Sequence, residues 1–208
     1  MRTATGAQKT VTLADGTRLV LNTATAVDVA FTATERRIRL VAGEVLISTA
    51  KDLSPTPRAF IVCTAQGSLR PLGTRFNVRD LGGSTRVAVF EGAVEVRPAA
   101  SALVAVVHAG EQMEFTAGAV QPKQPADASA DLWVQGMLLA RDMRLDALVA
   151  QLTRYHHGIL RCDPAAAGFT VSGAFPVLDV EASLVMLEKS LPVRIGRATS
   201  YWITVHAR

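Results

Sequence analysis

The sequence predicts a two-domain α+β protein, in which an all-β domain precedes a small α+β sandwich built from βαβ repeats. Three observations support this division. Residues 11–120 contain short alternating or β-branched runs separated by glycine-containing turns, without a helical period. Residues 121–131 are polar and interrupted by prolines, as in a linker. Residues 132–208 contain apolar residues at helical spacing between strand-like runs, and we expect residues 1–10 to be disordered.

Two turn signals in the first domain predict β-hairpins. Asp15 and Gly16 lie between two strand-like runs, which is the strongest short-range signal for a hairpin. Gly82 and Gly83 are flanked by turn-forming polar residues and predict a second hairpin tip.

A strand, one glycine and another strand recur at three junctions, around Gly43, Gly92 and Gly110. Recurring glycines between strands indicate positions that require positive φ or a close approach of two backbones. This arrangement is typical of stacked hairpins or of a short β-solenoid. The spacing between the three copies is unequal, so the repeat is irregular.

The second domain shows a strand–helix–strand pattern twice, followed by a last strand. The first copy is a strand over residues 133–140, a helix and a strand over 159–162. The helix of this copy is indicated by Leu145, Leu148, Val149, Leu152 and Tyr155, with Asp142 as its cap. In the second copy a strand over 169–172 precedes a helix that Asp179 caps and Pro192 ends. Strands over 193–195 and 201–205 complete the domain.

Composition excludes several classes of function. The chain has 49% apolar residues, enough for a core, and a net charge of +4 from 22 basic and 18 acidic residues. The basic residues are scattered, whereas a nucleic-acid interface requires a cluster, so we expect no nucleic-acid binding. The longest apolar run, residues 102–107, is too short to span a bilayer, and residues 1–8 lack the apolar core of a signal peptide.

The polar residues assemble no recognisable catalytic motif. The sequence contains no phosphate-binding loop, no zinc-protease motif and no Gly-x-Ser-x-Gly motif, and we expect neither an enzyme nor a cofactor. Glu91 and Glu95 are the one candidate carboxylate pair, because residues of like parity on a strand share a side. Such a pair would suit a carbohydrate-active enzyme, although solvated strand carboxylates are the more ordinary interpretation.

His156 and His157, with Cys162 as a third donor, are the best candidates for a metal site. Adjacent helical residues point about 100° apart, so the two imidazoles would not easily share one ion. The alternative is that positive charge is favoured at the end of a helix, and we expect no metal. Cys63 and Cys162 are expected as small buried residues, although an interdomain disulfide stays open.

Aromatic and apolar residues in the second domain are candidates for partner binding. Trp133, Tyr201 and Trp202 lie in the first and last predicted strands, which in small α+β folds often form sheet edges. We therefore expect residues 133–139 or 201–206 to accept a partner strand, although each tryptophan could equally be a core residue. The candidate contact residues are Trp133, Met137, Leu139, Tyr201, Trp202 and Ile203.

Four segments of the first domain, in this order, resemble the FecR family of transmembrane regulators of iron-responsive sigma factors. These segments are residues 13–23, 40–45, 72–78 and 89–96. The second domain resembles the short N-terminal (STN) domain shared by secretins and TonB-dependent receptors. That likeness rests on residues 142–148, 162–164, 171–173 and the second predicted helix.

The resemblance implies a non-enzymatic, periplasmic region of a single-pass inner-membrane regulator. It further implies a cytoplasmic sigma-binding segment and one membrane helix upstream of residue 1, and in many members regulated proteolysis. The expected partner is the periplasmic signalling domain of an outer-membrane TonB-dependent siderophore transducer, whose iron-uptake signal is relayed to an ECF sigma factor. The alternative is a structural envelope-assembly protein with a secretin-like domain.

Overall fold

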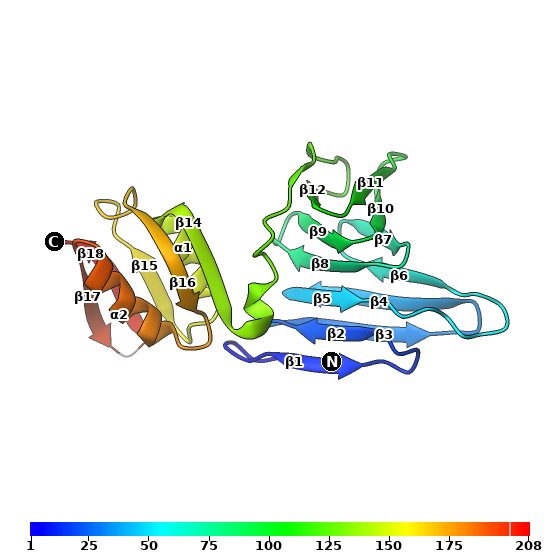
Figure 1. Cartoon of the computed structure of the whole chain (residues 1–208), viewed down its shortest axis with the longest axis horizontal. Helices are drawn as coiled ribbons and strands as arrows, with labels where there is room; N and C mark the ends of the chain where they lie inside the picture. Colours follow the sequence, from blue (N-terminus) through cyan, green and yellow to red (C-terminus); the bar gives the residue numbers. More distant parts are fainter. Residues whose placement is uncertain (200) are drawn as a thin grey trace. The chain divides into compact units, whose positions relative to one another are not determined.

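The structure is a computed structural model that describes residues 1–199 and 201–208. It divides into two compact units. Unit 1 contains residues 1–4 and 8–131, and unit 2 contains residues 5–7 and 132–208. The described α-helices both belong to unit 2, whereas unit 1 is built from strands (Figure 1). Among the described residues, no helix is long and apolar enough to cross a bilayer.

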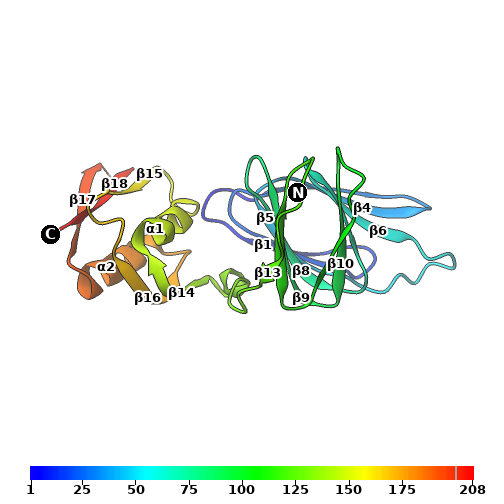
Figure 2. The same ribbon diagram turned by 90° about the horizontal axis from the view of Figure 1, so that it is seen from above.

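Unit 1 is a sandwich of two sheets that face each other (Figure 2). The first sheet has the order β1 (Lys9–Thr12), β2 (Arg18–Leu21), β5 (Glu44–Ser48), β8 (Arg75–Asp80), β9 (Thr85–Glu91), β12 (Glu111–Phe115) and β13 (Gln124–Pro125). The second sheet has the order β3 (Ala26–Phe31), β4 (Glu35–Ala42), β6 (Ala59–Cys63), β7 (Gly67–Pro71), β10 (Ala93–Pro98) and β11 (Ala105–His108). In both sheets the strands follow their order along the chain, so unit 1 advances as a short solenoid does.

The recurring glycines lie at corners where the chain passes from one sheet to the other. Gly43 joins β4 to β5 with a φ of 88°, and Gly92 joins β9 to β10 with a φ of 75°. A Cβ on Gly43 would collide with Thr25, and one on Gly92 would collide with the carbonyl oxygen of Gly73. The predicted positive φ and close approach are both confirmed at these corners.

The two predicted hairpins are also present. Gly16 has a φ of 85° in the turn between β1 and β2, and the Thr17 N–H donates to Asp15 Oδ1 over 3.0 Å. Gly82 has a φ of 84° in the turn between β8 and β9. Turn chemistry in the sequence therefore specifies both connections.

A buried carboxylate ties three strands of the first sheet together. Glu44, at the start of β5, is 4% exposed. Its two oxygens accept hydrogen bonds from Asn22 Nδ2 over 2.9 Å and Asn77 Nδ2 over 2.7 Å. The Glu44 N–H donates to Thr25 Oγ1 over 3.0 Å. Because buried polar groups are costly unless hydrogen-bonded, this network fixes β2, β5 and β8 in one register.

A second polar cluster holds the connection between β5 and β6 against the sandwich. Arg36 is 6% exposed and donates to Asp15 Oδ2 over 2.8 Å and to the Ala50 carbonyl oxygen over 3.1 Å. Arg58 pairs with Asp52 over 2.9 Å. Hydrogen bonds from the Arg58 side chain and backbone hold the pKa of Asp52 well below its ordinary value.

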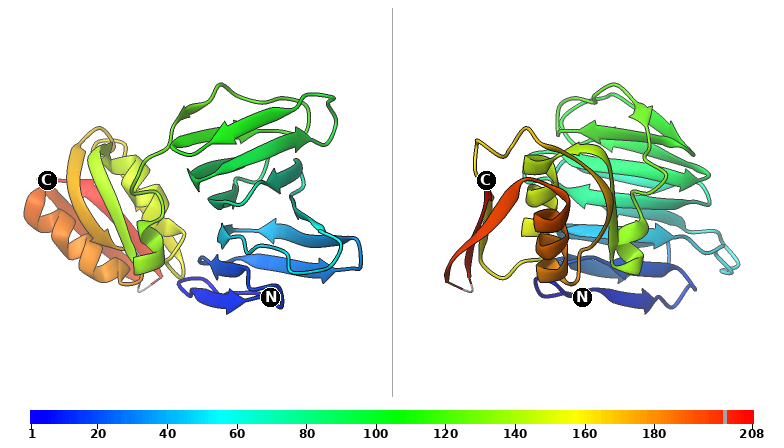
Figure 3. Two further views of the ribbon diagram at one scale, coloured as in Figure 1. Left: turned by 45° about the vertical axis from the view of Figure 1, so that its right-hand side comes forward. Right: turned by 60° about the vertical axis from the view of Figure 1, so that its left-hand side comes forward.

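In its described residues, unit 2 contains two small sheets with two helices between them (Figure 3). Its elements are η1 (Leu132–Gln135), β14 (Met137–Arg144), α1 (Leu145–Thr153), β15 (Ile159–Cys162), β16 (Thr170–Pro176), α2 (Val180–Ser190), β17 (Val193–Thr199) and β18 (Trp202–Ala207). One sheet pairs β14 with β16, and the other has the order β15, β18, β17. Helix α1 contacts β14 and β15, and α2 contacts β16 and β17, so each helix bridges the two sheets.

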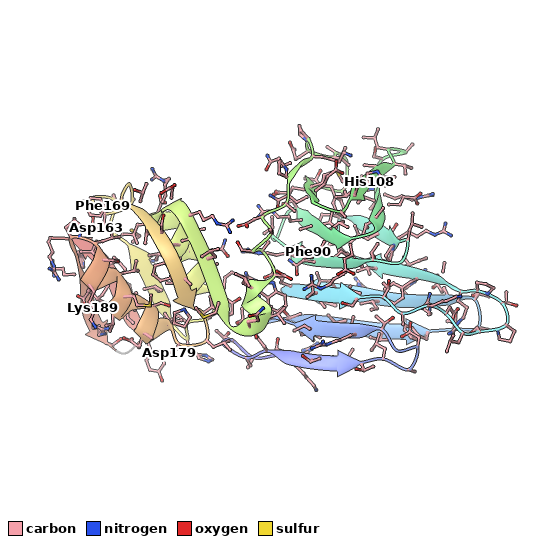
Figure 4. The ribbon with its side chains drawn as sticks, viewed as in Figure 1. Phe90, His108, Asp163, Phe169, Asp179 and Lys189 are labelled. Atoms are coloured by element: carbon pink, nitrogen blue, oxygen red, sulfur yellow. The ribbon has the colours of Figure 1, made fainter. Side chains whose placement is uncertain are left out.

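The predicted order of elements in unit 2 is confirmed, but their pairing differs from a βαβ unit. In a βαβ unit the two strands are parallel members of one sheet, whereas β14 and β15 belong to different sheets. Asp179 caps α2 as predicted, because its Oδ1 accepts from the Ala182 N–H over 2.9 Å (Figure 4). Asp142 is not the cap of α1: it has a φ of 47° at a bulge in β14, and Arg144 is the cap residue.

The segments expected as disordered tail and linker are instead parts of the folded units. Residue 2 forms a β-bridge with Ala26, and β1 already begins at Lys9. Within residues 121–131, β13 pairs with β12, and the division between the units follows Asp131. The prolines in this segment suggested a linker, but proline is also tolerated in an edge strand such as β13.

We predict that Glu44→Ala lowers the free energy of unfolding by about 3 kcal/mol, because the amides of Asn22 and Asn77 lose a buried acceptor. Urea denaturation monitored by circular dichroism measures this loss. The control Glu91→Ala changes an exposed carboxylate, and we expect an effect within about 0.5 kcal/mol. Equal effects of the two substitutions would contradict the structural role of Glu44.

We predict that Asp52→Asn destabilises the chain at neutral pH and that its effect shrinks in acid. The pKa of Asp52 is lower in the folded state, so its contribution is complete above the unfolded-state pKa of about 3.9 and declines as the pH falls further. Urea midpoints of wild type and variant, compared between neutral and strongly acidic pH, test this. A difference that grows on acidification would contradict the assignment.

Candidate protein-interaction edge

The two small sheets of unit 2 present four strand edges, those of β14, β16, β15 and β17. An edge strand carries unpaired N–H and C=O groups that can pair with another chain unless they are covered. Strand β18 contributes no edge, because it lies between β15 and β17.

On each of three edge strands, β16, β15 and β17, a helix side chain hydrogen-bonds to one outward backbone group. Each contact joins one helix residue to an outward backbone group: Ser183 Oγ to the Pro176 oxygen of β16 over 2.7 Å, Thr153 Oγ1 to the Leu160 oxygen of β15 over 3.0 Å, and Glu188 Oε1 to the Ile195 N–H of β17 over 2.6 Å. The hydroxyls donate and the carboxylate accepts. These three contacts occupy groups to which a partner strand would otherwise bind.

At Met137 and Leu139, the described residues show no such contact on the edge of β14. The Val177 N–H donates to the Gly136 oxygen over 2.8 Å, which sets the alternation along the strand. The backbone groups of Leu138 therefore face β16, and those of Met137 and Leu139 face away from it. Within the described part of the chain, no side chain hydrogen-bonds to these outward groups of Met137 and Leu139.

The structure separates the sequence candidates into two groups. Met137 and Leu139 lie on the open edge, and both side chains are half-buried. Trp133 lies before the strand, in η1, and is 6% exposed. Gly136, with a φ of 76°, separates η1 from β14, so the strand predicted over residues 133–140 begins only at Met137.

The expected edge at residues 201–206 is wrong. Ile203 is fully buried and pairs with Leu160 on one side and Arg197 on the other. Tyr201 and Trp202 are exposed, at 66% and 43%. Trp202 begins the central strand β18 and Tyr201 precedes it, so neither exposed ring marks a free strand edge.

Trp202 is held by a neighbouring cation. The Arg161 guanidinium lies 5.3 Å from the centre of its ring, within the range of a cation–π contact. Near the other end of β18, His206 Nδ1 lies 3.0 Å from Asp163 Oδ2. The Ala165 N–H and His206 hold the pKa of Asp163 below its ordinary value.

The candidate catalytic pair does not assemble. Glu91 ends β9 in the first sheet, whereas Glu95 lies on β10 in the second sheet, beyond the corner at Gly92. The strand parity that would place them on one side is interrupted by this change of sheet. Glu95 instead pairs with Arg97 over 2.7 Å.

The candidate metal ligands are also not gathered. Among residues 1–199 and 201–208, no three His, Cys, Asp or Glu side chains are placed to hold an ion. Cys63 and Cys162 are free thiols, and burial raises the pKa of Cys162.

Sequence reasoning missed the residues that distinguish the four edges, namely Thr153, Ser183 and Glu188. One signal was present: Ser183 is a polar residue on the apolar face of the second predicted helix, and it is fully buried. A buried hydroxyl requires a partner, and the partner here is an edge carbonyl.

Comparison with known proteins identifies the first part of the chain. Residues 1–95 match the model of the FecR protein family. A search of curated proteins finds no match. The chain is similar to two crystal structures of a "putative anti-sigma factor" from Parabacteroides distasonis ATCC 8503. The first, at 1.65 Å resolution, has 25% identity and a TM-score of 0.80. The second, at 2.50 Å, has 26% identity and a TM-score of 0.77.

Each alignment covers 100% of this chain and 98% of the neighbour, so the similarity extends over both units. The family match includes β1 to β9 of the β-sandwich and contains the corners at Gly43 and Gly92. Residues 1–95 are therefore similar to FecR proteins, and the whole chain is similar to two solved structures named as anti-sigma factors.

Proposed function

We propose that this chain is the periplasmic region of a sigma-factor regulator and that unit 2 receives its signal by strand addition at β14. The FecR match and the neighbours named as anti-sigma factors support the regulator role. The edge at Met137 and Leu139 is the observation that supports the site, because a helix side chain bonds to an outward backbone group on each of the other three edge strands but not here.

Strand addition suits the residues at this edge. Outward backbone groups supply hydrogen bonds that are independent of the partner's sequence, whereas flanking side chains provide selectivity. Met137 and Leu139 point to the same face of β14, since side chains alternate along a strand. Their half-buried apolar surfaces are available to pack against alternate residues of an added strand.

The partner we propose is the periplasmic signalling domain of an outer-membrane TonB-dependent siderophore transducer. This domain is expected to have an STN-like fold like that of unit 2, so two like sheets would join edge to edge. The full regulator would be anchored in the inner membrane and would relay the iron-uptake signal to an ECF sigma factor. The resemblance of the second domain to STN domains supports this choice.

We predict that Leu139→Pro weakens binding of the transducer's signalling domain by at least ten-fold, a loss of about 1.4 kcal/mol. Proline removes an outward N–H without removing a bond to β16. Titration calorimetry measures the affinity, and thermal unfolding verifies the fold.

Ala174→Pro is the matched control, because the N–H of Ala174 faces the opposite edge of the same sheet. We expect unchanged partner affinity in this variant. Wild-type affinity in a folded Leu139→Pro protein would refute pairing at β14. A stable homo-oligomer that does not bind the signalling domain would instead favour the envelope-assembly alternative.

A further inference from the structure

The outer face of the second sheet in unit 1 carries two rows of residues that cross the strands. The first row is Ala30, Arg37, Ile61, Arg70 and Glu95, and the second is Asp28, Arg39, Cys63, Ser68 and Arg97. Their neighbours along each strand, such as Ile38, Val62 and Leu69, are fully buried in the sandwich. Strand alternation therefore directs both rows to solvent.

The middle of this face is lower than its flanks. Ile61, Cys63 and Ser68 are short or half-buried, whereas the four arginines on either side of them are exposed. Two shallow hollows result. One is lined by Asp28, Ala30, Arg37, Arg39, Cys63 and Thr64, and the other by Ile61, Ser68, Arg70, Glu95 and Arg97.

Each hollow contains one arginine whose side chain forms an ion pair and one whose side chain does not. Arg37 pairs with Glu35 over 2.8 Å, and Arg97 pairs with Glu95 over 2.7 Å. The side chains of Arg39 and Arg70 form no ion pair and no hydrogen bond with any residue that the structure describes. Each hollow thus presents one guanidinium, whose planar fork can bind a carboxylate through two hydrogen bonds.

We propose that this face of the FecR domain binds an extended acidic segment of a partner protein, with one carboxylate at Arg39 and another at Arg70. The two arginines lie two strands and two residues apart, so their Cα atoms are separated by roughly 12 Å. Acidic residues four apart in an extended segment are separated by about 13 Å. The spacing of the two sites therefore suits such a segment.

The acidic residues on this face favour a protein segment over a uniform polyanion as the ligand. Asp28 and Glu95 lie in the hollows, beside Arg39 and Arg70. They would repel a nucleic acid or an anionic bilayer, in which negative charge is closely spaced. A protein segment can instead place a neutral or basic residue opposite each of them. This surface belongs to unit 1, so the inference does not depend on the β14 edge.

The test measures binding of a fluorescent glycine-rich peptide with two glutamates four residues apart, by anisotropy at low ionic strength. We expect the wild-type chain to bind it and the Arg39→Gln, Arg70→Gln double variant to bind at least ten-fold more weakly. The control double variant, Arg18→Gln and Arg161→Gln, removes the same charge at exposed positions elsewhere. Both double variants remove two positive charges, so any effect of net charge is the same in both. We expect the control to retain wild-type affinity, and a loss confined to the Arg39→Gln, Arg70→Gln variant therefore reports the site.

Three results would overturn the proposal. The first is no binding of the peptide to the wild-type chain, and the second is equal loss in the two double variants. The third is tighter binding of heparin or phosphatidylglycerol vesicles that depends on Arg39 and Arg70, which would assign the face to a polyanion or a membrane.

Discussion

The buried Glu44 carboxylate is the interaction on which the sandwich depends. It lies where the chain has just turned from the second sheet into the first, and it accepts from amides on both flanking strands. A buried carboxyl group without donors would cost several kcal/mol, so the three residues require one another. Asn22, Glu44 and Asn77 each belong to a segment that resembles the FecR family. The network therefore joins three segments that lie far apart in the sequence.

Local signals in the sequence predicted much of this fold. Gly16 and Gly82 predicted hairpins because turn geometry needs only the residues in the turn, and Asp179 predicted a helix start for the same reason. The pairing of β18 between β15 and β17 was beyond such signals. Strand order depends on contacts between residues that are distant in the sequence. The aromatic residues Tyr201 and Trp202 suggested an edge strand and are exposed, but the strand that follows Tyr201 is central in its sheet.

The same distinction applies to the candidate site. Met137 and Leu139 could be proposed from the sequence because they follow Gly136 in a strand-like run. Which edge stays open could not be proposed, because it depends on where helix side chains reach. Thr153, Ser183 and Glu188 each satisfy an outward backbone group of one strand. In the proposed function, the Met137–Leu139 part of β14 differs from the other edge strands because no helix side chain bonds to its outward backbone groups.

Amide hydrogen exchange during titration with the transducer's signalling domain tests the central claim most directly. Strand addition at β14 places the Met137 and Leu139 amides in new hydrogen bonds, so the account predicts that their exchange slows while that of the already bonded Ile195 amide does not. Unchanged exchange at Met137 and Leu139 in the saturated complex, or new protection confined to β15 or β17, would contradict it.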